Sequence, residues 1–177
     1  NPTLLETTML NGTYTALVTP FNQGEVDYDR LAKNVAFQIE HGIDGVVPVG
    51  TTGESPTLSH DEHAKVIEKT VEAAAGQCQV VAGTGSNSTT EALSLTQHAK
   101  DAGADVALMV NPYYNKPTQE GLYRHFMKIA DAVELPICLY NIPGRTNVTM
   151  SADTVVRLNE HPNIVAIKEA PGSLALA

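Results

Sequence analysis

The sequence predicts an α/β fold, a TIM (β/α)8 barrel, of which this chain contains about six βα units. Three observations support this prediction. Short apolar runs rich in Val, Ile and Leu alternate with amphipathic helical patterns, with a repeat of roughly thirty residues. The runs are mostly not interrupted by polar residues, which is typical of parallel strands buried on both faces. Alternating strands and helices joined by short links favour a parallel sheet with right-handed crossovers.

Six strands are expected in chain order, at Thr13–Thr19, Gly45–Val49, Gln79–Gly83, Val106–Asn111, Ile137–Asn141 and Ile164–Lys168. Helical patterns lie between them. In segments 31–39 and 122–133, apolar side chains recur with the 3.6-residue period of a helix that buries one face.

Helix starts and stops are marked as well. Ser59 with Glu62, and Ser88 with Glu91, have the spacing of a capping box, in which each side chain satisfies a free N–H group at a helix start. Three glycines occupy positions where helices are expected to end, because glycine tolerates the left-handed conformation found there: Gly42, Gly76 and Gly103.

A single domain is predicted over residues 1–177, apparently truncated after the sixth strand. A closed barrel needs eight units and typically about 250 residues, and an open six-stranded sheet leaves two unpaired edges. We therefore expect additional polypeptide to complete the barrel. The alternative is a doubly wound sheet, although no phosphate-type Gly-rich turn follows the first expected strand.

Composition excludes several classes of protein. Twenty acidic residues against eleven basic ones give a formal net charge of −9, which argues against binding to nucleic acid or to an anionic membrane. No apolar run approaches the roughly 18–20 residues of a membrane span. Asn1–Leu10 lacks the features of a secretory signal. Cys78 and Cys138 each lie in an apolar run, so we expect reduced, buried thiols in a cytoplasmic protein.

Polar residues gather where the expected strands end, which is the end that carries the chemistry in βα barrels. Lys168 emerges from the apolar run Ile164–Ile167. Burial would disfavour its ammonium form and leave a neutral amine able to attack a carbonyl. A solvated lysine at the end of a strand is the plainer interpretation.

Tyr140 ends the preceding strand, and because neighbouring strands lie about 4.8 Å apart its phenol can share a cavity with Lys168. A hydroxyl in reach can move the protons that imine formation requires. The turn Gly50–Gly53 offers successive N–H groups for a small carboxylate and Thr hydroxyls for proton relay. Arg145 offers a bidentate fork for a second carboxylate, or else forms a surface ion pair.

Taken together, these residues resemble the dihydrodipicolinate synthase branch of the pyruvate-dependent class I aldolases. The resemblance covers the whole chain. It is carried by five segments in family order, GTTGES (50–55), AGTGSN (82–87), NPYYNKP (111–117), YNIPGRT (140–146) and IKEA (167–170).

The resemblance implies that pyruvate and aspartate semialdehyde are the substrates, condensed to 4-hydroxy-tetrahydrodipicolinate in lysine biosynthesis. Lys168 is implied as the Schiff-base amine, and the backbone of Thr51 and Thr52 as the site of the pyruvate carboxylate. Further implied roles are proton relay by Thr52, Tyr140 and, from a neighbouring subunit, Tyr114, and binding of the semialdehyde carboxylate by Arg145. No metal or organic cofactor is implied. The family typically forms a homotetramer, a dimer of dimers.

A feedback site for lysine is also implied, at Ser55, His60, His63, Asn87, Glu91 and Tyr113. The two histidines share one face of a helix, with a spacing that is also common on plain surfaces. A zinc site is a third interpretation, but no further ligand follows the pair at a suitable spacing. Pro56 departs from the family pattern in the neighbouring loop.

Two other functions compete with the synthase. Sialic acid lyases resemble the chain in fold and Schiff-base lysine but lack the Gly-Arg-Thr that follows Tyr140 here. A non-catalytic binding chain that retains the motifs, but lacks the last two βα units, is the other alternative.

Overall fold

The computed structural model of the chain describes residues 10–172. Its centre is a sheet of six parallel strands in the order β1-β4-β5-β6-β7-β8. The bounds are β1 Tyr14–Ala16, β4 Gly45–Val47, β5 Gln79–Gly83, β6 Val106–Val110, β7 Ile137–Asn141 and β8 Ile164–Glu169. All six expected strands are therefore confirmed, although the first, second and fourth are shorter than predicted and the sixth extends one residue further. The segments 1–9 and 173–177 lie outside the described residues, including most of the stretch inspected for a secretory signal.

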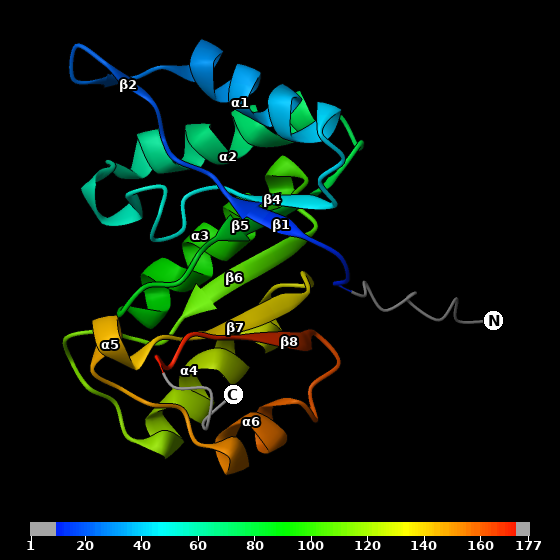
Figure 1. The fold of residues 1–177 in the computed structure, drawn as a ribbon. Helices are drawn as coiled ribbons and strands as arrows, with labels where there is room; N and C mark the ends of the chain where they lie inside the picture. The colour runs from blue at the N-terminus through cyan, green and yellow to red at the C-terminus, as the bar shows by residue number, and fades with distance from the viewer. Residues whose placement is uncertain (1–9, 173–177) are drawn as a thin grey trace.

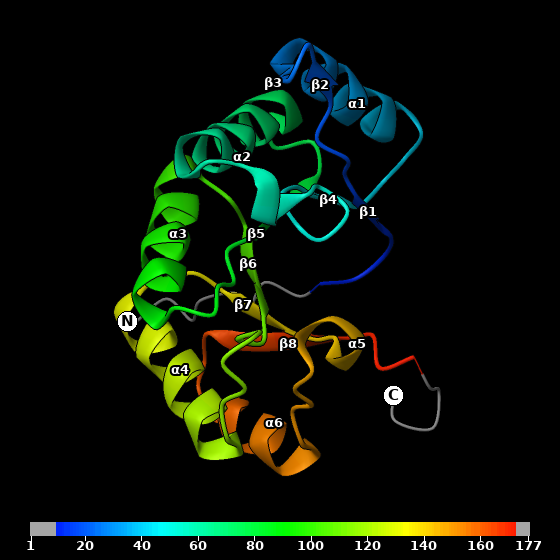
Figure 2. The same cartoon turned by 90° about the vertical axis from the view of Figure 1, so that its left-hand side faces the viewer.

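Five helices cover one face of this sheet: α1 Tyr28–Glu40, α2 His60–Ala74, α3 Thr89–Ala102, α4 Gln119–Ala132 and α6 Ala152–Leu158. Each contacts the next, and together they form an arc outside the curled sheet (Figures 1 and 2). A doubly wound sheet has helices on both faces, so that alternative is wrong. The arrangement is that of a (β/α)8 barrel with six of its strands present.

The sequence did not predict several short elements. Phe21–Asn22 (β2) and Glu25–Val26 (β3) form a small antiparallel hairpin ahead of α1. A 3-10 turn, η1, covers Ser55–Thr57, and a single helical turn, α5, covers Pro143–Thr146. η1 follows β4 and α5 follows β7, so both turns lie at the C-terminal ends of the strands, where the candidate site residues also lie.

Helix ends agree with the predicted signals in most places. The capping box of α2 is complete, since Ser59 accepts from the N–H of Glu62 and the Glu62 carboxylate accepts from the N–H of Ser59. The box predicted for α3 is wrong in its second half. Ser88 accepts from the N–H of Glu91, but the Glu91 carboxylate bonds to Ser86 and a neighbouring helix instead.

Two apolar layers hold the strands in place. The larger lies between sheet and helices and contains Leu31, Ile67, Met109, Phe126 and Ile137, each fully buried. The smaller lines the inner, concave face of the sheet with Val47, Val81, Val106, Leu108, Cys138 and Tyr140. Both cysteines are buried as predicted, and burial raises the pKa of the Cys138 thiol to about 11.

The predicted burial of every strand on both faces is only partly correct. The four central strands are almost entirely buried, whereas most of β1 and β8 is partly exposed. The cause is their position, because each pairs with a single neighbour among the described residues. None of the helices in residues 10–172 combines the length and apolar character that crossing a bilayer requires.

Candidate active site

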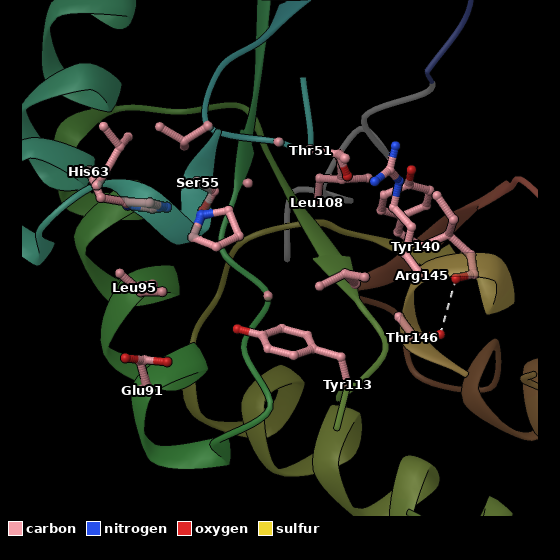
Figure 3. A pocket seen from close by; sticks show the side chains of 18 of the residues that line it. Thr51, Ser55, His63, Glu91, Leu95, Leu108, Tyr113, Tyr140, Arg145 and Thr146 are labelled. Carbon is pink, nitrogen blue, oxygen red and sulfur yellow. Dashed lines mark hydrogen bonds between the residues drawn. The ribbon is translucent and has the colours of Figure 1, made fainter. Parts of the chain in front are cut away.

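A cavity of about 510 Å³ opens at the C-terminal ends of the central strands (Figure 3). Its walls come from the ends of β5, β6 and β7, from the loops after β4, β5, β6 and β7, and from helices α2 and α3. Among the predicted site residues, those that line it are Thr51, Ser55, His60, His63, Glu91, Tyr113, Tyr140 and Arg145. Thr51, Tyr140 and Arg145 gather at one end of the cavity, while His63 and Glu91 lie toward the other (Figure 3).

Tyr140 and Lys168 meet as the sequence predicts. They are direct partners in the β7–β8 register, so both side chains leave the same face of the sheet. The Lys168 Nζ lies 4.4 Å from the centroid of the Tyr140 ring, within the range of a cation–π contact. Tyr140 is only 6% exposed and borders the cavity. The pair therefore combines a phenol at the cavity with an amine beside it.

The burial expected for Lys168 is not found, because its side chain is exposed in this structure. An apolar run in the sequence indicates a buried strand only where neighbours cover it. Here β8 forms an edge of the described sheet, and its inner face is only partly covered. The contact with Tyr140, rather than burial, is what places the amine.

Close backbone packing shapes the loop after β4. Val49 adopts a left-handed conformation with φ of 46°, which is strained for a β-branched residue. Its carbonyl oxygen would lie 2.3 Å from a Cβ at position 83, so only glycine fits at Gly83. A Cβ at Gly85 would likewise meet the backbone nitrogen of Val110 at 2.4 Å. These two contacts explain the glycines of the AGTGSN segment, for which the sequence alone offered no reason.

The turn itself is closed by its own backbone. The N–H groups of Gly53 and Glu54 donate to the carbonyls of Gly50 and Thr51. Within residues 10–172, the N–H groups of Thr51 and Thr52 have no hydrogen-bond acceptor, as a nest for a carboxylate requires. Only Thr51 borders the cavity, and it faces the end that holds Tyr140. Thr52, expected as the proton-relay hydroxyl, is exposed outside the cavity lining.

Arg145 is presented by α5, a turn that begins at Pro143, whose fixed φ suits the first position of a helix. The Thr146 hydroxyl, which lies 3.1 Å from the carbonyl of Ile142 and 3.0 Å from that of Val148 and can donate to either, holds the turn. The guanidinium borders the cavity and forms no ion pair with any residue in the described range, so the surface ion-pair interpretation is not supported.

Glu91 anchors the other end of the cavity. Its carboxylate accepts from the Ser86 hydroxyl and lies 2.7 Å from His60 Nε2. The bond from Ser86, together with His60, lowers the pKa of Glu91 although partial burial opposes the shift. This carboxylate therefore stays ionised, and its position is the reason why the capping box of α3 is incomplete.

His63 lies on α2 one turn after His60 and is only 4% exposed, so it is not a surface residue. Burial lowers its pKa to about 4, with the neighbouring His98 contributing in the same direction. Its Nδ1 is buried and has no hydrogen-bond partner in the described part of the chain. Among residues 10–172, no group of three His, Cys, Asp or Glu side chains is close enough to hold a metal ion.

Of the remaining predicted residues, Tyr114 and Asn87 lie outside the cavity lining. Tyr113 lines the cavity, but Tyr114, with φ of 71°, is 90% exposed and is not part of the lining. Asn87 is not part of the lining, and its carbonyl accepts from the Asn115 side chain. The relay role of Tyr114 requires a second subunit and stays a prediction.

Sequence reasoning missed several contributors. Apolar walls come from Leu58, Leu95, Leu108, Val110 and Ile142. A polar cluster around Asn141, at the ends of β6, β7 and β8, was also missed. In the sequence, this cluster is visible only as three polar residues at or just after the ends of expected strands, Asn111, Asn141 and Glu169. Their positions do not reveal which of them form hydrogen bonds with one another.

Comparison with known proteins gives a consistent result. The model of the dihydrodipicolinate synthetase family matches residues 9–177. A 4-hydroxy-tetrahydrodipicolinate synthase from Geotalea daltonii is 60% identical over 169 residues, which cover 96% of this chain and 58% of the relative. The chain thus spans somewhat more than half the length of the curated relatives it matches.

Solved structures agree with this result. Dihydrodipicolinate synthase from Acinetobacter baumannii, complexed with pyruvate, superposes with a TM-score of 0.92 at 54% identity, covering 95% of this chain and 58% of that one. The enzyme from Cyanidioschyzon merolae, with lysine bound, superposes with a TM-score of 0.89 at 47% identity, covering 93% and 57%.

Proposed function

Because the chain belongs to the dihydrodipicolinate synthetase family, we propose that its activity is the condensation of pyruvate with aspartate 4-semialdehyde through a Schiff base on Lys168. The product is 4-hydroxy-tetrahydrodipicolinate, which is used in lysine biosynthesis. The observation that carries this proposal is the pairing of Lys168 with Tyr140 beside a cavity that also presents Thr51 and Arg145. The pyruvate complex of the relative from Acinetobacter baumannii supports the choice of first substrate.

The chemistry begins when the Lys168 amine adds to the keto carbon of pyruvate. Loss of water leaves an imine, and this step needs a proton delivered to the departing oxygen, a task that suits the Tyr140 phenol. Thr51, rather than Thr52, is the threonine at the cavity, so we assign the relay hydroxyl to Thr51. The free N–H groups of the turn suit the pyruvate carboxylate.

Removal of a methyl proton turns the imine into an enamine, whose carbon attacks the aldehyde of the second substrate. Arg145 lies at the same end of the cavity and offers two parallel N–H donors to the semialdehyde carboxylate. The amino group of the semialdehyde then replaces Lys168 at the imine carbon, which closes the ring and frees the enzyme. The lysine itself serves as the electron sink, so no cofactor enters these steps.

Trapping tests this proposal. The chain is incubated with pyruvate and reduced with borohydride, and peptides are analysed by mass spectrometry for an adduct on Lys168. Lys168→Ala must abolish the adduct, while Lys128→Ala, at an exposed lysine on α4, must leave it unchanged. A folded chain without an adduct would contradict the proposed activity and favour a non-catalytic binding role. A sialic acid lyase is not favoured, because the relatives are synthases.

We also propose that lysine binds at the far end of the cavity as a feedback inhibitor. His63 and Glu91 lie at this end, Ser55 and Tyr113 also line the cavity, and the ionised Glu91 suits an ammonium group. The lysine-bound relative from Cyanidioschyzon merolae supports this assignment. If it is correct, Glu91→Gln abolishes lysine binding measured by calorimetry, whereas pyruvate trapping persists.

The exposed Tyr114 supports a proposed homo-oligomer, in which this side chain reaches a neighbouring subunit. We propose a tetramer built from two dimers, and sedimentation velocity of the wild type measures its size. A cytoplasmic location accords with two free, buried cysteines and with a function in amino-acid biosynthesis.

A further inference from the structure

Two rows of side chains cross the C-terminal ends of β6, β7 and β8, on opposite faces of the sheet. The strand register pairs the residues of the inner row, which are Val110, Tyr140 and Lys168. One residue further along each strand lies the outer row, which consists of Asn111, Asn141 and Glu169. Because successive side chains of a strand alternate between faces, the outer row lies directly behind the reactive pair.

Hydrogen bonds join the outer row through Asn141. Its Nδ2 donates to both carboxylate oxygens of Glu169 at 3.0 Å. Its Oδ1 accepts from Asn111 Nδ2 and from the backbone N–H of Met150, each at 3.0 Å. Asn141 is 3% exposed and Asn111 is fully buried, so the bonds from Asn111 and Met150 are shielded from water, while the bonds to the partly exposed Glu169 are partly buried. The amide of Asn141 is therefore satisfied on both of its atoms, whereas Asn111 Oδ1 has no partner among the described residues.

Each bond reaches a segment that carries a site residue. Glu169 follows Lys168 on β8, and Asn111 precedes the loop that presents Tyr113. Met150 ends the loop that returns from Arg145. Asn141 thereby connects three strand ends and one loop, although it faces away from the cavity.

Register is the property that this cluster controls. The pairing of β7 with β8 is irregular near its start, where Ile137 pairs with Ile164 but Cys138 pairs with Ala166. A slip of one residue moves every side chain of a strand to the other face, and it would place a residue other than Lys168 beside Tyr140. The bond from Asn141 to Glu169 fixes the register at the end of the pair where the chemistry occurs.

We propose that Asn141 and Glu169 are positioning residues for the aldolase site, which hold Lys168, Tyr140 and the Arg145 loop in register from behind the sheet. This inference rests on the proposed function. It extends that function to residues that do not contact substrate.

The positioning role can be tested in the full chain by exchanging the hydrogen-bond donor, Asn141, with its acceptor, Glu169. Asn141→Asp places two carboxylates in contact and removes the donor, so the rate of borohydride-trapped adduct formation on Lys168 should fall about ten- to a hundredfold. In the double variant Asn141→Asp/Glu169→Gln, the glutamine amide donates to the new aspartate. That aspartate still accepts from Asn111 and Met150. The double variant should return to within about threefold of the wild-type rate.

A matched control separates position from stability. Asn163→Asp makes the same change at the opposite end of the β7–β8 pair, where the Asn163 amide donates to the carbonyl of Ala130. This variant should trap pyruvate at the wild-type rate per folded molecule, even if its melting temperature falls. Should Asn141→Asp not fold, Glu169→Ala, at a partly exposed side chain, must show the same slowing.

The outcomes are distinguishable. A folded wild type that forms no adduct overturns the proposed function and this inference together. If the wild type traps pyruvate and Asn141→Asp traps it equally fast, only the positioning role is overturned. Failure of the double variant to recover, when its dichroism is native, also overturns that role.

Discussion

Mild acid should destabilise the protein through two buried histidines. His63 and His125 are 4% and 5% exposed, and burial lowers the pKa of each to about 4. His125 Nδ1 bonds to the Thr89 hydroxyl, while its Nε2 is buried without a partner in residues 10–172. In the folded protein, a protonated ring would carry a charge that water cannot solvate, so protonation is unfavourable. In the unfolded chain, water solvates both charged rings.

The sign follows from linkage. The unfolded state binds protons below its ordinary histidine pKa of 6.5, and the folded state does so only below about 4. Stability is therefore complete above pH 6.5 and is lost progressively between pH 6.5 and 4. Between pH 7.5 and 5, each histidine accounts for a loss of about 2 kcal/mol, so the pair accounts for about 4 kcal/mol. The carboxylates of Glu62, Glu91 and Glu120 have lowered pKa values and contribute mainly below this window.

Urea unfolding at pH 7.5 and pH 5 measures this loss directly. His125→Asn retains a hydrogen-bonding side chain opposite Thr89 but cannot titrate. Between pH 7.5 and pH 5, the free energy of unfolding of this variant should therefore fall by about 2 kcal/mol, whereas that of the wild type should fall by about 4 kcal/mol. Equal losses in the two proteins would refute the reasoning, because the protonation of His125 would then not be coupled to unfolding.

Three further predictions concern the site and its supporting loop. Thr51→Ala should slow pyruvate trapping about a hundredfold by removing the hydroxyl at the cavity, whereas Thr52→Ala should leave the rate within about twofold. Arg145→Lys should lower kcat/KM for the semialdehyde about ten- to a hundredfold through loss of the bidentate fork, with pyruvate trapping unchanged. Gly83→Ala should lower the free energy of unfolding by about 1–3 kcal/mol, because the new Cβ meets a backbone oxygen at 2.3 Å. Gly144→Ala, whose Cβ meets nothing within 4 Å, should be neutral in the same urea titration.

Local patterns in the sequence were sufficient for the six strands of the sheet, for the helices between them and for most of the site. Apolar runs predicted the six strands because a buried strand needs apolar side chains on both faces wherever it lies. The same reasoning failed for Lys168, since an edge strand has a neighbour on one side only. Pattern alone cannot tell a central strand from an edge strand.

Pairings between distant segments could not be predicted in this way. Glu91 has the spacing of a capping box, but in the fold Ser86 and His60 are better placed partners for its carboxylate. Thr51 and Thr52 are adjacent and chemically alike, and only the path of the turn decides which one faces the cavity.

The sequence by itself determined the order of strands and helices, the placement of Tyr140, Arg145 and Lys168 at strand ends, and the family to which they belong. The tertiary structure alone decided the irregular register of β7 with β8 and the bonds that join Asn141 to Glu169 behind Tyr140 and Lys168. The physical reason is that periodicity and capping act over a few residues of chain. Register and burial depend on contacts between segments about thirty residues apart, which no local pattern encodes.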